Sequence, residues 1–546
     1  MKPINKKSFK TNRATKKTLP IFLIFLFSIS ALMAVGCSSP LPPSNLSTIE
    51  QAATIHVYDP NHWLHQIGGM GVQRGSAVTT STNGAIVYTV GTIYNAVDIS
   101  YVDGPVTGPN GAQFDEKKKS VQAYVPEAII MTKHSLQGHL AGYRILGHFP
   151  AGRVQDIKVD AVGNIYIAGY FWKEISLTPW MNLKGSSQVW NGFLAKFDKQ
   201  GQIIWATITE GSTSNRNLGI HLSSGRILVT GSIAPNATIT SYTSQNNPTS
   251  TTLNNVGGLV LSSHRLTNGS TIFRRVVSGA IGNQVTADST GNIWNCGEFS
   301  GTFAPAPGVS ATTSATQRDG FLARLAPNGT WTWAKALGGQ TTAACVDVAV
   351  DDKEQARVVG YFYNDIHAHI QVLGRRAGST GLKVSSSLGS SDVFTSLVSS
   401  AGVTLAFRAS GGSGTDRPTG LAQKGGKTLI TGYHQKEFYL DTKTKTKNLV
   451  DKGSYAGFLI NGSALYGIGA EPDCNGGVTI PAGVAWGYLI SARVPEHASF
   501  VVGSFTKCTK FTSPGFGLLP NKDIVVPKSK ITSYDSYDIF IWKRRL

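Results

Sequence analysis

One sequence pattern recurs seven times and constrains the fold of this chain more than any other feature. The pattern is an apolar strand, a turn that often carries glycine, and a second strand that ends in glycine and is followed by an aromatic or aliphatic residue. Its clearest copies are residues 160–171 and 288–299. A repeat at a regular period indicates an array of similar supersecondary units. The marker glycines are Gly91, Gly169, Gly231, Gly297, Gly360, Gly432 and Gly503.

A second pattern lies between these glycines and predicts another hairpin in every repeat. Residues 319–339 show it best, as two alternating strands joined by an Asn-Gly turn. Both series advance by about 69 residues per repeat, and two hairpins make four strands. Four-stranded units repeated radially are the blades of a β-propeller. The first-strand markers of this hairpin are Ile129, Phe193, Leu259, Phe321, Phe394, Phe458 and Phe540.

The two ends of the repeat region supply an independent argument for a closed ring. Residues 538–546 match the first strand of the second hairpin and lack its partner, whereas residues 62–69 match that partner, as seen in residues 332–339. We therefore predict an all-β protein, a seven-bladed β-propeller whose last blade takes its outer strand from the N-terminal side. The composition agrees, because 15% charged residues and 61 glycines suit short strands and tight turns.

The best copies of the repeat resemble a family of bacterial β-propeller repeats known as SBBP. The likeness rests on residues 192–205 and 319–339, which match the family's DGFLAKL and WAKALGG segments, and it extends over residues 56–546. Membership of such a family implies a scaffold and no defined chemistry. We accordingly expect no cofactor and a monomeric propeller that acts by binding.

The N-terminal region is typical of an export signal. Residues 1–17 carry seven basic and no acidic residues, and an apolar run follows to Gly36. The run ends in Ala-Val-Gly-Cys37, which resembles a bacterial lipoprotein signal, so Cys37 is the expected site of lipidation, including palmitate. An uncleaved membrane anchor is the alternative. The predicted organisation is a signal peptide at residues 1–36, a flexible tether at 37–55 and the propeller at 56–546.

The residue after Cys37 bears on the location of the protein. Ser38 is not the aspartate that retains many Gram-negative lipoproteins at the inner membrane. By that resemblance we expect a lipid-anchored envelope protein at the outer membrane or cell surface. Periplasmic and surface orientations, and the type of host envelope, stay open.

The connections between the second and third strands of the repeats are long for hairpins. They span residues 94–126, 172–190, 234–256, 300–318, 363–391, 435–455 and 506–537. Because all of them lie on one side of a propeller, we expect a loop-rich face that binds a protein or a polysaccharide. Tolerated insertions or extra edge strands are the alternative explanation of their length.

Two groups of side chains are candidates for metal binding or crosslinking. Asp365, His367 and His369 alternate on one stretch and are weak candidates for a metal site, since they share a face if the stretch is extended. Four cysteines follow Cys37, an even number that permits disulfides in an oxidising compartment. The propeller brings Cys474 and Cys508 to one face and favours that bridge. Cys296 and Cys345 would then pair or remain buried thiols.

The remaining sequence evidence separates binding from catalysis and from nucleic-acid recognition. The serine-hydrolase, zinc-protease, phosphate-loop and sialidase motifs are missing from the sequence. The alternative function is a carbohydrate-active propeller enzyme, a glycosidase or lyase, with two carboxylates from different blades near the axis. The net charge of +19 is scattered and no nucleic-acid module is recognisable.

Overall fold

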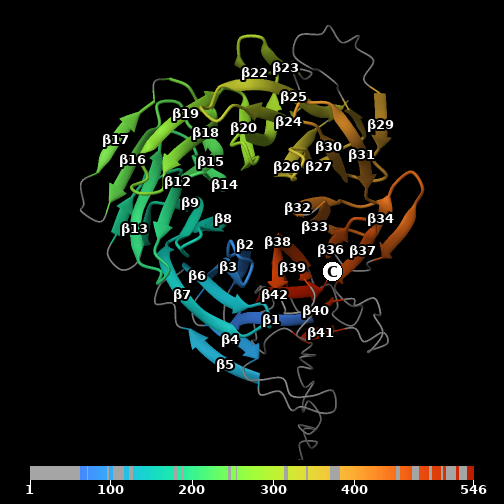
Figure 1. Ribbon diagram of the computed structural model, residues 1–546, viewed down its shortest axis with the longest axis horizontal. Helices are drawn as coiled ribbons and strands as arrows, with labels where there is room; N and C mark the ends of the chain where they lie inside the picture. The colour runs from blue at the N-terminus through green and yellow to red at the C-terminus, as the bar shows by residue number, and fades with distance from the viewer. Residues whose placement is uncertain are drawn as a thin grey trace, which may run out of the picture. The chain divides into compact units, whose positions relative to one another are not determined.

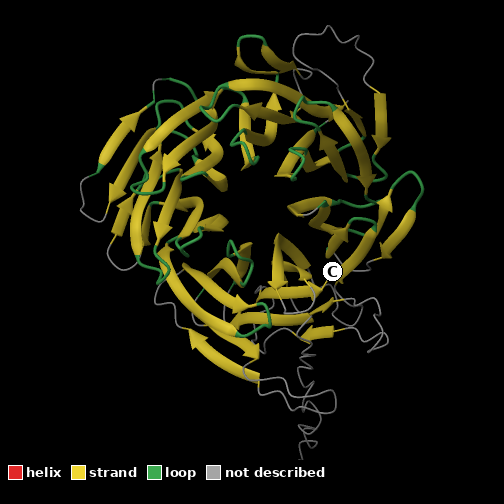
Figure 2. Cartoon of the chain, viewed as in Figure 1, coloured by secondary structure: helices red, strands yellow, loops and turns green. Residues whose placement is uncertain are grey.

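The computed structural model places most of the repeat region as strands. The chain divides into two compact units, Met1–Gln51 and Ala52–Leu546, and every described residue belongs to the second. Strands, turns and bends account for these residues, with no helix among them, as Figure 2 shows. A helix able to span a membrane is accordingly not found in this described part. The structure describes residues 62–69, 72–94, 97–102, 116–121, 127–177, 181–186, 188–243, 248–253, 255–312, 318–339, 342–368, 382–424, 426–450, 455–469, 479–490, 495–505, 508–511, 524–527 and 538–545.

Seven antiparallel sheets surround a central axis in the unit Ala52–Leu546 (Figure 1). Each blade has four main strands, numbered here strand 1 to strand 4 from the axis outward, and in five blades two further strands continue the sheet at its outer edge. Strands such as β9 (Ile165–Trp172) and β12 (Trp190–Phe197) are buried on both faces, because each face of a blade packs against a neighbouring blade. The predicted all-β, seven-bladed propeller is confirmed.

The strands of each blade follow in order from strand 1 to strand 4. Blade 1 contains β2 (Arg74–Thr80), β3 (Ile86–Ile93), β6 (Glu127–Ser135) and β7 (Leu140–Phe149); blade 2 contains β8 (Gly152–Val159), β9 (Ile165–Trp172), β12 (Trp190–Phe197) and β13 (Ile203–Glu210). Blade 3 contains β14 (Arg216–Ser223), β15 (Arg226–Ile233), β18 (Gly258–Arg265) and β19 (Thr271–Val277); blade 4 contains β20 (Ala280–Ala287), β21 (Ile293–Ser300), β24 (Arg318–Leu325) and β25 (Trp331–Gly339). Blade 5 contains β26 (Ala343–Val350), β27 (Ala356–Phe362), β30 (Asp392–Val398) and β31 (Thr404–Ser410); blade 6 contains β32 (Arg417–Lys424), β33 (Lys427–His434), β36 (Ala456–Asn461) and β37 (Ala464–Gly469). Blade 7 contains β38 (Thr479–Ile490), β39 (Pro495–Phe505), β42 (Asp538–Arg545) and β1 (His62–Gly69).

Blade 7 joins the two ends of the repeat region. Strand β42 pairs antiparallel with β39 on one side and with β1 on the other, with Leu64 opposite Trp542. The predicted closure of the ring by a hairpin split between the termini is confirmed. This pairing gives blade 7 its fourth strand from the other end of the repeat region.

The marker glycines lie where strand 2 passes closest to strand 1. In blade 2 a Cβ at Gly169 would collide with the carbonyl oxygen of Arg153 on strand 1 and with the ring of Phe193 on strand 3. The same carbonyl collision would occur in four further blades, at Gly231, Gly297, Gly360 and Gly432. Every strand 1 also carries a β-bulge beside its marker glycine, which bends the strand next to the axis. Glycine is therefore required by close packing of backbone.

The strand pairing corrects two of the first-strand markers. The marker glycine lies opposite Ile130 in blade 1 and opposite Val260 in blade 3, one residue after the predicted Ile129 and Leu259. Both blades have apolar residues at the two adjacent positions, so hydrophobicity alone did not distinguish the registers.

The long connections between strands 2 and 3 contain hairpins that extend the preceding blade. In five cases the hairpin hydrogen-bonds to strand 4 of that blade, as β10 does to β7. The other two, β22–β23 and β34–β35, form separate two-stranded sheets. Extra edge strands therefore account for the length of these connections. The hairpins are β4 (Val97–Val102) with β5 (Glu116–Val121), β10 (Glu174–Leu177) with β11 (Met181–Lys184), β16 (Thr238–Thr243) with β17 (Thr249–Thr252), β22 (Thr302–Ala306) with β23 (Val309–Thr312), β28 (Asp365–Ala368) with β29 (Leu382–Ser386), β34 (Glu437–Asp441) with β35 (Thr446–Val450), and β40 (Cys508–Phe511) with β41 (Ile524–Pro527).

Candidate functional site

The propeller has two faces with different chemistry. The turn face carries the tight turns between strands 1 and 2 and between strands 3 and 4, such as residues 160–164 and 198–202 of blade 2. The crossover face lies at the other ends of the strands, where strand 2 ends and strand 3 begins, as at Trp172 and Trp190. Each face places a different set of polar side chains at the junctions between blades.

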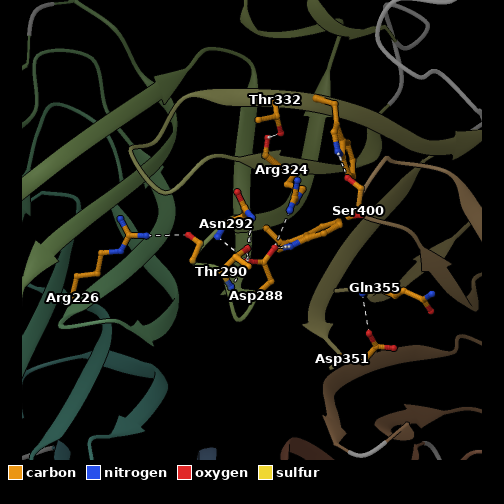
Figure 3. Close-up of polar contacts among 12 residues, drawn as sticks. Arg226, Asp288, Thr290, Asn292, Arg324, Thr332, Asp351, Gln355 and Ser400 are labelled. Carbon is orange, nitrogen blue, oxygen red and sulfur yellow. Dashed lines mark hydrogen bonds and ion pairs between the residues drawn. The ribbon is translucent and has the colours of Figure 1, made fainter. Parts of the chain in front are cut away.

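Aspartates on the turn face hold their own turns together. Asp288 accepts hydrogen bonds from the backbone N–H groups of Thr290 (3.2 Å) and Asn292 (2.8 Å), as Figure 3 shows. Asp160 accepts the corresponding bonds from Val162 and Asn164. An aspartate that accepts N–H groups two and four residues ahead stabilises a turn. Asp160 and Asp288 therefore stabilise the turns between strands 1 and 2 of their blades.

The carboxylate of Asp288 also contacts side chains of strands 2 and 3 of its blade. Arg324 lies 3.1 Å from its carboxylate and over the ring of Trp294, with 5.3 Å from the guanidinium carbon to the ring centroid. The hydrogen bonds from Thr290, Arg324, Asn292 and Trp294 outweigh the effect of burial and lower the pKa of Asp288. Because its oxygens are occupied in this way, Asp288 has a structural role.

Cations on strand 4 link each of several blades to the next across the turn face. Arg144 donates to the carbonyl of Gln200 (3.0 Å), Arg275 to that of Gly329 (2.8 Å) and Arg408 to that of Gly462 (3.2 Å). Tryptophans do the same in blades 2 and 4, where Trp333 donates to the carbonyl of Ser400, labelled in Figure 3. These bonds satisfy turn carbonyls that have no strand partner.

Two aspartates near the axis join neighbouring strands 1. Asp156 of blade 2 accepts the backbone N–H of Ile220 in blade 3 at 3.0 Å, and Asp347 of blade 5 accepts that of Leu421 in blade 6 at 2.7 Å. They occupy equivalent positions directly after the strand-1 bulge. The Asp156 carboxylate also lies 2.6 Å from the ammonium group of Lys158.

Burial and nearby charges shift the pKa values of these axial groups. Burial raises the pKa of Asp347 to about 7, and the negative charge of Asp156 acts in the same direction. Burial lowers the pKa of His221 to about 4, aided by the positive charge of Lys158. The alternative function expected two carboxylates near the axis, and Asp156 and Asp347 are such a pair. Both, however, accept backbone N–H groups of their own and the next blade.

The crossover face carries an aromatic–arginine cluster at the junction of blades 5 and 6. Arg417 lies over the ring of Tyr361, at 4.1 Å from the centroid, and its guanidinium donates to the hydroxyl of Tyr363. The rings of Tyr433 and Tyr455 lie beside them in an edge-to-face pair with centroids 5.4 Å apart. All five side chains are half-buried. We call these residues the 5–6 aromatic cluster.

A similar cluster lies at the junction of blades 2 and 3. Arg216 lies 5.1 Å from the ring centroid of Tyr170, and Trp190 packs edge-to-face against both Tyr170 and Trp172. The three rings are half-buried and Arg216 is exposed. We call these residues the 2–3 aromatic cluster. Sequence reasoning missed both clusters, although an aromatic residue directly after Gly169, Gly360 and Gly432 was visible in the repeat.

Several sequence-predicted residues fall outside the described residues. Cys37, His369 and Cys474 are in this group, so the predicted lipidation and the Cys474–Cys508 bridge stay predictions. Asp365 and His367 lie on β28, whose pairing with β29 shifts register between Ile366 and His367. Within the described ranges, no group of three potential ligands is close enough to hold a metal.

The other cysteine pair forms an inter-blade crosslink. Cys296 on β21 of blade 4 and Cys345 on β26 of blade 5 are bonded as a disulfide, with their Cα atoms 5.7 Å apart. Both residues are fully buried. The crosslink joins strand 2 of one blade to strand 1 of the next.

Comparison with known proteins adds no assignment to this geometry. No protein-family model matches the chain, and no curated protein matches it either.

Proposed function

We propose that this protein is an extracytoplasmic binding scaffold whose crossover face binds an acidic polysaccharide. The β-propeller itself fits a binding role. The observation that carries the proposal is the pair of aromatic–arginine clusters at the 2–3 and 5–6 junctions. Half-buried rings offer flat apolar surfaces without being removed from solvent, and arginine matches carboxylate and sulfate groups through paired donors.

The rest of the molecule supports the same proposal. The clusters are held by rigid strand ends at blade junctions, and preorganised groups lose little conformational entropy on binding. A basic chain attracts polyanions over longer distances. The axial carboxylates Asp156 and Asp347 serve backbone donors of two blades each, which favours ring closure over acid–base chemistry as their role.

Affinity electrophoresis of the full chain in gels containing a polyuronate, a sulfated polysaccharide or a neutral glucan tests the proposal. We expect retardation by the acidic polymers, and about tenfold weaker binding after combined substitution of Tyr170→Ala and Tyr361→Ala. Tyr143→Ala is the matched control, because this half-buried tyrosine lies on strand 4 of blade 1, away from both clusters.

Two results would reject the polysaccharide proposal. One is equal retardation of the double variant and the unchanged chain. The other is crosslinking in native envelopes that joins the crossover face to a protein while no acidic polymer retards the chain.

The envelope location is part of the proposal and has its own test. Cys37 carries the lipid and anchors the propeller through the tether at residues 37–55. Mass spectrometry of the mature N-terminus should find a lipidated Cys37, and Cys37→Ser should release the protein into the soluble fraction. An intact Met1 on the mature protein would contradict this anchor.

A further inference from the structure

A cavity of about 380 Å³ lies between blades 5 and 6 on the turn face. Blade 5 lines it with Arg357 on β27, Thr395 on β30 and Arg408 on β31. Blade 6 adds Lys427 on β33 and the turn glycine Gly462. The cavity is thus shared by two blades and bordered by three cationic side chains.

The strand register shows why this junction is open. Counting from the marker glycines, Ala406 occupies the strand-4 position that holds Trp205 in blade 2, Phe273 in blade 3 and Trp333 in blade 4. Blades 1 and 6 also have small residues there, Gly142 and Ala464. In blade 2 the tryptophan is fully buried and donates to the carbonyl of Leu266 in the next blade. An alanine at this position leaves the space of the ring unfilled.

Arg357 is equally unusual for its position, three residues before the marker glycine. The other six blades have a buried aromatic or aliphatic side chain there, and in blades 1, 2 and 4 a strand-3 cation lies over the ring. Blade 5 instead has the cation on strand 2, opposite Leu397 on strand 3. The six equivalent residues are Tyr88, Tyr166, Leu228, Trp294, Leu429 and Phe500.

Thr395 departs from its six counterparts in the same direction. It follows Phe394, the partner of the marker glycine, and its equivalents are all apolar and buried. At this junction Arg357 and Thr395 therefore replace side chains that are apolar in the other six blades, beside the space left at Ala406. The equivalents of Thr395 are Met131, Leu194, Leu261, Leu322, Leu459 and Ile541.

The polar atoms of this cavity are not satisfied by its walls. Nε of Arg357 and Oγ1 of Thr395 are buried and have no hydrogen-bond partner among the described residues. Arg408 donates a hydrogen bond of 3.2 Å to the carbonyl of Gly462. Burial and the charge of Arg357 lower the pKa of Arg408 and outweigh the attraction of Asp441. The Asp351 carboxylate attracts Arg357 but accepts its hydrogen bonds from Lys353, Gln355 and Gln423. Buried donors without partners are costly, so the site favours an anionic acceptor.

We propose that the cavity between blades 5 and 6 binds a small organic oxyanion, a molecule with one carboxylate, sulfate or phosphate group. Arg357 and Arg408 bind the oxyanion through their guanidinium N–H groups, and Thr395 donates its hydroxyl. The cavity exceeds the volume of an inorganic anion, and Phe407, Ile430 and Ile460 line the remainder with apolar surface. A sugar acid, or another compact organic acid, fits a cavity that has cationic side chains on one part of its wall and apolar side chains on the rest.

This site is independent of the proposed polysaccharide function. It lies on the turn face, whereas the aromatic clusters lie on the crossover face. Loss of one activity therefore leaves the other testable.

Isothermal titration of the full chain with inorganic phosphate, sulfate, glycerol phosphate and glucuronate tests the proposal, with methyl glucoside as the neutral probe. We expect saturable binding of one equivalent of at least one organic anion, tighter than inorganic phosphate or sulfate and weaker at higher ionic strength. Absence of saturable binding of all four anions overturns the proposal. Equal binding of the neutral probe overturns it too.

Two variants assign the binding to this cavity. Ala406→Trp introduces the side chain of blades 2 and 4, and Arg357→Leu introduces that of blades 3 and 6. We expect each to weaken binding at least tenfold while thermal unfolding stays cooperative. Arg275→Leu, the counterpart of Arg408 at the 3–4 junction, should change the affinity less than twofold. Unchanged affinity in Ala406→Trp, or equal loss in Arg275→Leu, places the anion elsewhere.

Discussion

The 2–3 and 5–6 junctions share the same inter-blade contacts at both ends, and they differ in the side chains packed between those contacts. Both have an axial aspartate that accepts a backbone N–H of the next blade, and both have an arginine stacked on the tyrosine that follows the marker glycine. Between these two features the 2–3 junction is closed by a buried tryptophan. The 5–6 junction has the polar cavity in its place.

The difference extends to the crossover side of the same junctions. At the 2–3 junction the corresponding residues are the neutral Asn191 and Asn215. In each of them the amide oxygen accepts a hydrogen bond and the amide nitrogen donates one. The equivalent residues of the 5–6 junction are the buried carboxyls Asp392 and Asp416. Backbone register therefore sets the frame, and individual side chains decide whether a junction is a closed core or a polar site.

The largest expected effect comes from opening the closed junction. Trp205→Ala should lower the free energy of unfolding by about 3–5 kcal/mol, because it creates a cavity and leaves the Leu266 carbonyl without its donor. Ala406→Gly, at the open junction, should cost about 1 kcal/mol. Denaturant unfolding measures both. Equal losses would mean that the two junctions are packed alike.

Removal of an axial aspartate should lower the free energy of unfolding by less than Trp205→Ala does. Asp156→Ala and Asp347→Ala each leave two backbone N–H groups without their acceptor, so we expect a loss of about 2 kcal/mol in either junction. The plan shared by the two junctions predicts similar values. A loss confined to one variant would show that the axial bonds are not equivalent, and chemical denaturation of both variants measures this.

The buried carboxyls of the 5–6 junction, where the 2–3 junction has asparagines, should make stability fall as pH rises. Burial raises the pKa of Asp392 to about 7 and that of Asp416 to about 8, and the negative charge of Asp392 acts in the same direction on Asp416. Since the folded pKa exceeds the unfolded value of about 4, stability falls as pH rises from about 4 to 8. Asp416→Asn, which copies Asn215, should reduce this slope.

Thermal unfolding between pH 5 and pH 9 measures that slope. We expect Asp416→Asn to be more stable than the unchanged chain at pH 9 by on the order of 1 kcal/mol, and similar to it at pH 5. The charge of Glu437 also raises the pKa of Asp416, so Glu437→Gln is the control for its contribution. Identical pH profiles would show that Asp416 does not titrate in this range.

The smallest effect should separate the two arginine stacks. Arg417→Ala should lower the free energy of unfolding by about 1 kcal/mol, since its half-buried guanidinium contacts two tyrosine rings. Arg216→Ala should cost about 0.5 kcal/mol, because Arg216 is exposed and contacts one ring. The difference is measured by parallel denaturant titrations. A larger loss in Arg216→Ala would reverse this ordering.

The periodic glycines and alternating strands were sufficient to predict the blades and the split hairpin. They could do so because each reports a local requirement, close backbone contact at Gly169 or a turn at Asp288. The hairpins that extend the preceding blade were visible in the sequence only as unusually long connections between strands 2 and 3. Their pairing with the preceding blade depends on residues tens of positions apart, as between β10 and β7.

The candidate sites were less accessible to sequence reasoning than the fold. Arg417 and Tyr361 meet only because strand 1 of blade 6 lies against strand 2 of blade 5. Arg357 and Thr395 look ordinary in the chain, and their departure from the other blades appears only when the strands are aligned by hydrogen-bond register.

The sequence by itself determined the repeat, the number of blades and the closure of the ring, because periodic patterns of apolar residues and glycine act locally in every copy. Only the tertiary structure decided which side chains share a junction, since contacts between blades join residues about one repeat apart in the chain. The aromatic clusters, the axial bonds and the cationic cavity all arise at these junctions, where packing between blades sets the chemistry.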